Sequence, residues 1–471
     1  MSAAGQVLLM TPALGLFYGG LVSSTAATST MMLSVGTLAI VSVLWFLVAY
    51  SLAFAPSADA VGLIGDLSLA GLAFPDRVRD GTNVSEHAFA LFQAMFAAIT
   101  PAVISGAVCG RMRYTAFLGF AAIWTIVVYS PLAHWVWEPS GWLLKLGLLD
   151  FAGGCVVETA SGVSAYVLAY WLGETKGAEQ SGGDRKSAQP PPPHNVPFVL
   201  LGAGILWWGW LGFNGGAGLT TTGYGARILL NTHTAASVAT MAWGALEVAL
   251  PLGKQPFTGR PTAVGAACGA IVGLVAITPA CGYVAVYGGA AIAVAAATAC
   301  FFATRNLNRL TGISDRLDVA AFHGVAGIVG TISVGLFATK RADSPTDGLF
   351  YAPGGTGPRQ LGVQVCGVVA TIALCVVGTS LSYWLCVGVA VALGGSRESL
   401  HISGGELRAD EAESFESAYI GSVHGGSVHG AGASMLPLPL NSNEAVYVNA
   451  DDSSAHGLRA GLENSRRGLA R

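Results

Sequence analysis

Long apolar stretches alternate with short polar connections over the first 393 residues of this 471-residue chain. A helix needs about 20 mostly apolar residues to cross the hydrocarbon core of a bilayer. Eleven stretches approach or exceed that length and are predicted to be transmembrane helices: 2–22, 31–54, 88–110, 114–135, 151–172, 196–215, 228–250, 262–279, 281–302, 318–338 and 361–393. The pattern predicts an all-α polytopic membrane protein.

A glycine- and proline-rich connection over residues 174–195 divides the spans into two groups of five, followed by an eleventh. Because five is an odd number, the two groups would cross the membrane in opposite directions, as in transporters built from inverted repeats. A short echo agrees with this division, since Ala-Ile-Thr-Pro-Ala occurs at 98–102 and again at 276–280. We therefore expect two inverted five-helix repeats plus an eleventh helix.

The composition narrows the class of protein. Hydrophobic residues make up 53% of the chain and charged residues only 10%, against roughly 25% charged in soluble domains. This excludes a cytosolic enzyme, a nucleic-acid binder and a disulfide-built secreted domain. With the N-terminus outside, the short inner loops carry more Lys and Arg than the long outer loops, which favours a cytoplasmic C-terminus.

Two ionisable residues lie in the middle of predicted spans. Glu158 is in the fifth span and His323 is in the tenth, and each such residue costs about 3 kcal/mol at the bilayer centre. Pseudo-symmetry between the halves would bring them together near the midplane. We interpret them as a site that handles protons or cations, and the alternative is a buried polar pair that fixes the register of two helices.

Aromatic residues gather near the predicted outer ends of several spans. Phe92 and Phe96 are one helical turn apart, Phe213 lies in a glycine-rich stretch, and Trp137 ends the fourth span. Aromatic faces attract cations, although a tryptophan at a span end is also an ordinary interfacial anchor. His134, near the same end, is expected to be a water-exposed interfacial histidine.

Neither a metal nor a cofactor is expected. The eight cysteines lie in or beside apolar runs without the C-x-x-C spacing of a metal site. Glu158 and His323 could serve an intramembrane enzyme, but no His-Glu-x-x-His motif and no activated nucleophile accompanies them.

Several ordered segments are similar to one known family. The most specific are Asp150–Gly162, Gly209–Gly216, Asn231–Ala235 and Phe322–Gly330. Together with Met10–Gly20, they give the chain a close resemblance to the ammonium transporter (Amt/Mep) branch of the ammonium transporter/Rhesus superfamily. The resemblance implies transport of ammonium and methylammonium by a homotrimer with eleven helices and one pore per subunit. It also implies the plasma membrane, with the N-terminus outside.

The resemblance assigns roles to individual positions near the outer mouth. Trp137 and Phe96 match an outer recruitment site that holds ammonium against aromatic faces, and Phe96 and Phe213 match a stacked pair that closes the outer mouth. Asp150 matches an acid that supports the recruitment site. Ala217 stands where the family usually has a serine at that site, so one hydrogen-bond acceptor for the cation is missing.

The pore itself departs from the usual pattern. His323 matches the second of two pore histidines, whereas Glu158 replaces the first, as in one branch of the fungal transporters. The two groups would titrate as a coupled pair. Our hypothesis is electrogenic transport, as ammonium or as ammonia plus a proton, in which the pair relays the proton.

The sequence after the last span is predicted to form two further regions. The membrane domain covers 1–393, a regulatory segment 394–419 resembles one that docks on a neighbouring subunit, and 420–471 is predicted to be a disordered cytoplasmic tail. The long tail is the local support for an alternative function, an ammonium sensor that signals through it. Relatives usually have more residues before Met10, which leaves open a first helix that starts late or is truncated.

Overall fold

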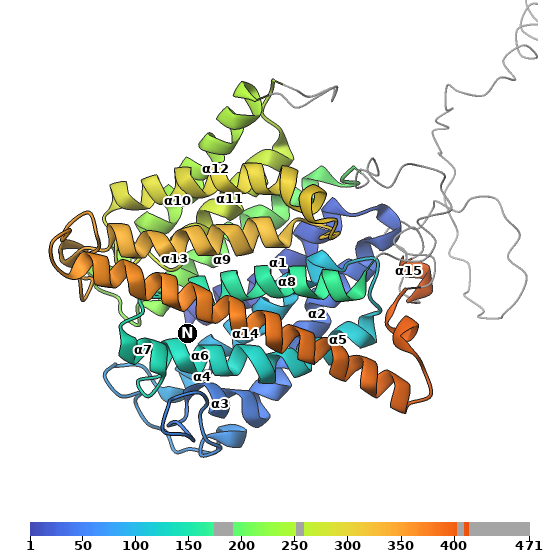
Figure 1. The fold of residues 1–471 in the computed structure, drawn as a ribbon, viewed down its shortest axis with the longest axis horizontal. Coiled ribbons are helices and arrows are strands. Elements are labelled where there is room, and N and C mark those ends of the chain that lie inside the picture. The colour runs from blue at the N-terminus through green and yellow to red at the C-terminus, as the bar shows by residue number, and fades with distance from the viewer. Residues whose placement is uncertain (174–191, 251–258, 403–408, 414–471) are drawn as a thin grey trace, which may run out of the picture. The chain divides into compact units, whose positions relative to one another are not determined.

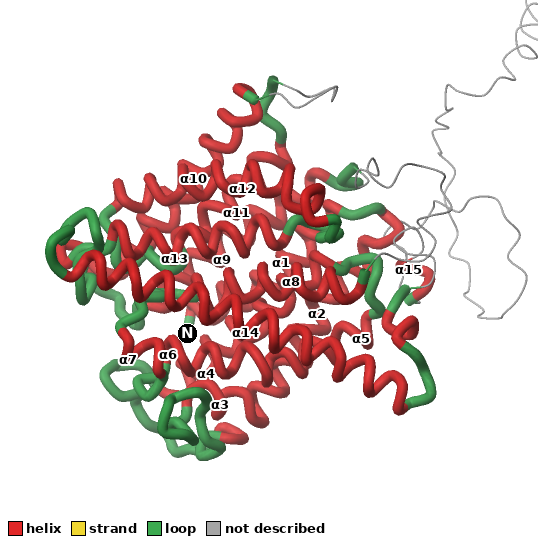
Figure 2. The backbone as a smooth tube through the Cα atoms, viewed as in Figure 1, coloured by secondary structure: helices red, strands yellow, loops and turns green. Residues whose placement is uncertain are grey.

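The computed structural model describes residues 1–173, 192–250, 259–402 and 409–413. These residues form helices, with four isolated β-bridges and no longer strand among them. The α-helices are α1 (Ser2–Leu21), α2 (Ala27–Leu44), α3 (Tyr50–Phe54), α4 (Glu86–Ile104), α5 (Tyr114–Trp124), α6 (Ser130–Trp137), α7 (Trp142–Leu146), α8 (Ala160–Leu172), α9 (Val196–Ala217), α10 (Gly223–Ala249), α11 (Ala263–Ile277), α12 (Val286–Thr311), α13 (Ala326–Phe337), α14 (Thr356–Ala392) and α15 (Ala409–Ala412). Most long helices run side by side (Figure 1), and most connecting loops lie at the helix ends (Figure 2).

The prediction of an all-helical, multi-pass membrane protein is confirmed. Among the described residues, nine helical segments are long and apolar enough to cross a membrane. Each of the eleven predicted stretches overlaps a helix. Two of those helices fall outside the nine: α10, which has 27 residues, and the shorter apolar α11, which has 15.

In the part of the chain that the structure describes, four π-helical segments interrupt or open the long helices. The segment η2 (Trp45–Ala49) joins α2 to α3, and η5 (Thr125–Tyr129) joins α5 to α6. The segments η6 (Gly154–Thr159) and η8 (Ala320–Val325) open α8 and α13. π-helical turns are rare and frequently occur at functional sites, and here η6 carries Glu158 while η8 carries His323.

Glycines allow η8 to approach α8 closely. A Cβ atom on Gly162 would lie 2.9 Å from the carbonyl carbon of His323, and closer still to the backbone of Gly324. Such separations are shorter than any ordinary carbon contact. The two backbones therefore touch because position 162 has no side chain.

Candidate functional site

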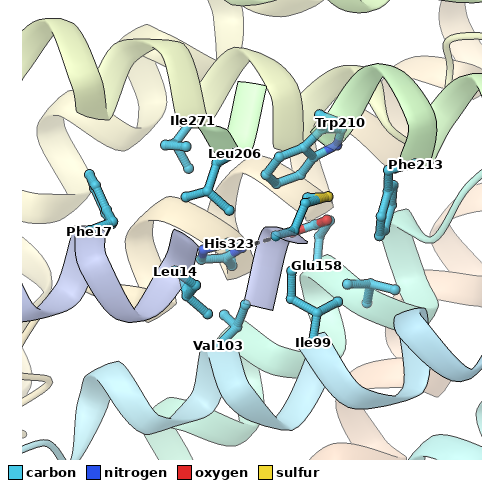
Figure 3. A pocket seen from close by; sticks show the side chains of 12 residues that line it. Leu14, Phe17, Ile99, Val103, Glu158, Leu206, Trp210, Phe213, Ile271 and His323 are labelled. Carbon is cyan, nitrogen blue, oxygen red and sulfur yellow. Dashed lines mark hydrogen bonds and ion pairs between the residues drawn. The ribbon is translucent and has the colours of Figure 1, made fainter. Parts of the chain in front are cut away.

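The two mid-span ionisable residues meet inside the helix bundle. Nδ1 of His323 lies 2.8 Å from Oε2 of Glu158, and their side chains are 6% and 1% exposed. Figure 3 shows the interaction as a dashed line between side chains that come from different helices. The expected pairing of the fifth and tenth predicted spans is therefore present in the structure, as a hydrogen-bonded contact.

A narrow cavity passes this pair and is otherwise lined mainly by apolar side chains. The lining residues are Met10, Leu14, Phe17, Ile99, Val103, Val157, Glu158, Leu206, Trp210, Phe213, Ile271 and His323. In Figure 3, Phe17 and Phe213 lie on opposite sides of the view with Glu158 and His323 between them. Within the described part of the chain, Oε1 of Glu158 has no hydrogen-bond partner, so this oxygen can accept a bond from a molecule in the cavity.

Two stacked phenylalanines close one end of the cavity. The rings of Phe96, on α4, and Phe213, on α9, are stacked with centroids 3.9 Å apart and an angle of 17° between their planes. Both residues are 1% exposed. Phe92 packs on Phe96 from one turn away, with centroids 4.8 Å apart. The stack therefore leaves no open space between the two rings.

Trp137 approaches the stacked pair from α6. Its ring meets Phe96 edge-on, with centroids 6.1 Å apart, and its indole N–H donates a 3.0 Å hydrogen bond to the backbone carbonyl of Asp150. Ala217, at the last position of α9, is partly exposed and offers only a methyl group. Trp137 is partly exposed as well, so its ring is accessible to a cation arriving from outside the stack.

Asp150 holds the start of the helix that carries Glu158. Its carboxylate accepts hydrogen bonds from the backbone N–H groups of Gly153, Gly154 and Cys155 at 2.9, 2.5 and 2.8 Å. A carboxylate at a helix N-terminus is stabilised both by these unpaired donors and by the helix dipole. The side chain is therefore engaged by its own helix, while its backbone carbonyl contacts Trp137.

Sequence reasoning missed some residues of the site and misjudged another. Trp210 lies one turn before Phe213, lines the cavity and donates its indole N–H to Oγ1 of Thr278 at 2.8 Å.

The expectation of a water-exposed His134 is wrong. His134 is fully buried, and its ring nitrogens contact the carbonyl of Ala53 at 3.1 Å and Oγ of Ser57 at 2.7 Å, because residues of the outer loop cover the end of α6.

The chemistry of these side chains limits what the arrangement can do. Aromatic faces can attract a cation, and a buried carboxylate–imidazole pair can hold or exchange a proton. The described residues contain no group of three His, Cys, Asp or Glu side chains placed to hold a metal ion.

Comparison of the sequence with known proteins finds relatives over most of the chain. The model of the Ammonium Transporter Family matches residues 1–404. The chain is 42% identical to an ammonium transporter of Bacillus subtilis over 347 residues, covering 73% of this chain and 81% of the relative. It is 37% identical to an ammonium transporter of Aquifex aeolicus over 420 residues, covering 88% and 91% of the two chains.

Solved structures show the same fold. The crystal structure of Saccharomyces cerevisiae Mep2 matches with a TM-score of 0.70 and 32% identity, covering 82% of this chain and 83% of that one. A structure described as a sensor Amt protein matches with a TM-score of 0.73 and 26% identity, covering 88% of this chain and 95% of that one.

Proposed function

Because the chain belongs to the ammonium transporter family, we propose that it carries ammonium and methylammonium across the membrane through a pore that passes Glu158 and His323. Trp137, Phe96 and Ala217 form the outer recruitment site. Phe96 and Phe213 form the outer gate. Asp150 supports the recruitment site through the backbone carbonyl that binds Trp137.

The observation that carries this proposal is the buried contact between Glu158 and His323 on the cavity wall. An intact ammonium ion would lose its hydration in a narrow apolar passage, at a large cost in free energy. Transferring a proton from ammonium to the pair lets the neutral amine cross the apolar part, and the pair then releases the same proton on the far side, where the amine takes it up again. Transport is then electrogenic, because one positive charge accompanies each ammonia molecule.

A test of the relay is the substitution Glu158→Gln, which keeps the size of the side chain and removes its charge. We expect the ammonium-evoked current, measured on proteoliposomes adsorbed to a solid-supported membrane, to fall by at least tenfold and its pH profile to shift. Unchanged currents with an unchanged pH profile would overturn the relay.

The matched control is Glu247→Gln. The carboxylate of Glu247 accepts hydrogen bonds from the backbone N–H and the hydroxyl of Thr262 at 2.8 and 2.9 Å, and Glu247 is not among the cavity-lining residues. Its removal should leave the pH profile of the current as it is.

We propose that α10 and α11 complete a set of eleven membrane spans built as two inverted repeats plus α14. The spacing of the pore residues supports the repeats. Asp150 precedes Glu158 by eight residues, Asp315 precedes His323 by the same number, and the carboxylate of Asp315 accepts a 2.7 Å bond from the N–H of Ala320 at the start of η8. Each half thus pairs a helix-capping aspartate with a pore residue.

The two echoed Thr residues support the repeats independently. The hydroxyl of Thr100 donates to the carbonyl of Phe96 at 2.7 Å, and that of Thr278 donates to the carbonyl of Leu274 at 2.8 Å. Both bonds bridge four residues of a helix, at equivalent places in the two halves.

The proposed domain boundaries are a membrane domain over 1–393, a regulatory segment over 394–419 and a tail over 420–471, which lies outside the described residues. The described part of the regulatory segment contacts the same chain. The carboxylate of Asp410 accepts the backbone N–H groups of Ser29 and Thr28 at 2.7 and 3.3 Å, and His401 forms an antiparallel bridge with Met112. We further propose a homotrimer in the plasma membrane with a cytoplasmic C-terminus.

A second candidate function is ammonium sensing, which is favoured by the structural similarity to the sensor Amt protein. The regulatory segment would then report pore occupancy, since its contacts reach the start of α2. Removal of the residues after 420 should abolish signalling and spare uptake. Loss of uptake on the same truncation would contradict the sensor function.

A further inference from the structure

Gln364 is a fully buried amide in the third turn of α14, and every hydrogen-bonding position of its side chain is used. Its amide nitrogen donates to the backbone carbonyl of Leu149 at 2.8 Å and to that of Thr331, on α13, at 3.0 Å. Its amide oxygen accepts the backbone N–H of Leu149 at 2.9 Å and the amide of Gln360 at 3.1 Å. A side-chain amide offers two donors and two acceptor positions, so none remains for another partner.

The contact with Leu149 is unusual because one side chain binds both polar groups of the same residue. Leu149 lies in the loop between α7 and η6, where its backbone has no helical partner. A buried backbone N–H or carbonyl without a partner costs about 1–3 kcal/mol. The conformation of this loop is therefore specified from α14, which belongs to neither of the two proposed repeats.

The loop that Gln364 holds leads directly to the outer aromatic site. The carbonyl of Leu149 belongs to the same peptide unit as the nitrogen of Asp150, and the carbonyl of Asp150 is the acceptor for the indole N–H of Trp137. A rotation of the peptide before Asp150 would move that acceptor. The N–H of Phe151, in the peptide unit of that acceptor, donates to the carbonyl of Pro279 at 3.1 Å. The position of the acceptor for Trp137 is therefore set jointly by this bond and by the amide of Gln364.

We propose that Gln364 is a positioning residue for ammonium binding at the outer site, acting through Asp150 and the indole N–H of Trp137. The inference rests on the proposed recruitment role of Trp137. It predicts that removing the amide weakens capture of the substrate and leaves later steps of transport unchanged. Gln364 does not line the cavity, so a direct effect on the passing substrate is not part of the proposal.

The neighbouring Gln360 provides a matched control. It lies one turn earlier on α14, is buried to a similar degree and donates to the carbonyl of Gly147 at 3.1 Å. Its second hydrogen bond goes to Oε1 of Gln364, and in the described structure it forms no hydrogen bond with Leu149, Asp150 or Trp137. A general loss of packing between α14 and the loop would affect both glutamines alike.

The experiment compares methylammonium uptake by proteoliposomes containing the wild type, Gln364→Met or Gln360→Met. Met keeps the length of the side chain and removes the amide. We expect Gln364→Met to raise KM by about five- to tenfold with Vmax within about twofold, and Gln360→Met to leave both within about twofold. Equal effects of the two substitutions, or a loss confined to Vmax, would overturn the proposal.

Trp137→Phe supplies the test of mechanism, because it keeps an aromatic ring and removes the N–H. If Gln364 acts through the indole N–H, the double variant Gln364→Met/Trp137→Phe should have nearly the same KM as Trp137→Phe alone. If the fold-increases in KM of the two single variants multiply in the double variant, Gln364 acts by another route. If Gln364→Met does not fold, Gln364→Asn keeps a neutral amide but draws it back from Leu149 by one methylene group, and it should give the same non-additivity.

The recruitment role itself is tested separately with Trp137→Leu, which removes the ring. An unchanged KM in that variant would overturn both recruitment and the role of Gln364. If Trp137→Leu raises KM but the effects of Gln364→Met and Trp137→Phe multiply in the double variant, the recruitment role stands and only the role of Gln364 is overturned.

Discussion

A methyl group at position 162 should separate the two pore residues. In Gly162→Ala, the new Cβ would lie 2.9 Å from the carbonyl carbon of His323 and closer to the backbone of Gly324. Ordinary carbon contacts begin near 3.5 Å, so α8 and η8 must move apart by about 1 Å. The same movement would stretch the 2.8 Å contact between Nδ1 of His323 and Oε2 of Glu158 to roughly 3.8 Å, beyond hydrogen-bonding distance.

The energetic expectation has two opposing parts. Alanine favours a helix over glycine by about 1 kcal/mol, whereas overpacking a tight contact costs about 1–3 kcal/mol. Gly119→Ala is the control, because in the described structure a Cβ on Gly119, in α5, meets nothing within 4 Å. Gly119→Ala should therefore be neutral or slightly stabilising, and Gly162→Ala should lower the thermal stability.

The assay is methylammonium uptake by proteoliposomes with equal amounts of protein, together with thermal unfolding in detergent. We expect Gly162→Ala to lose at least tenfold in uptake and Gly119→Ala to keep wild-type uptake. Wild-type transport by a well-folded Gly162→Ala variant would refute the requirement for a direct contact between Glu158 and His323.

Two further predictions concern Ala217, at the end of α9, and Asp315, in the loop before η8. Ala217→Ser restores a hydroxyl acceptor at the outer site and should lower the KM for methylammonium by up to about tenfold; an unchanged KM in uptake assays would remove position 217 from the site. Burial raises the pKa of Asp315, in the loop before η8, from 3.8 to about 6, so folding favours its protonated form. Its contribution to stability is present at low pH and is lost as the pH rises through about 6. Asp315→Asn should therefore reduce the fall in unfolding temperature between about pH 4 and about pH 7, and an identical fall in both proteins would contradict this.

The sequence predicts the membrane helices well because hydrophobic length is a strong physical signal in a bilayer. The sequence predicts the ends of the helices less well than their presence. The predicted 281–302 span continues to Thr311 in α12, since its polar final turns carry no hydrophobic signal. The π-helical segments η2, η5, η6 and η8 were not predicted either, because a change in hydrogen-bond register does not alter the hydropathy of the sequence.

The residues of the site also differ in how well the sequence predicts them. Glu158 and His323 were found because ionisable residues inside a span are rare and expensive. Gln364 was missed because burying an uncharged amide costs less free energy than burying an ionisable group, so its presence in a span is a weaker signal. Its partners, at 149 and 331, are also far away in the sequence. The burial of His134 could not be predicted, since it depends on how the outer loop folds over the end of α6.

The central claim, electrogenic passage of ammonium past a glutamate–histidine pair, is tested most directly by measuring charge and substrate together. Proteoliposomes containing the wild-type protein would be held at a fixed membrane potential while labelled methylammonium uptake and transported charge are recorded. We predict about one positive charge per methylammonium molecule, because the proton follows the neutral amine. Uptake that is unaffected by the membrane potential and carries no charge would contradict the claim.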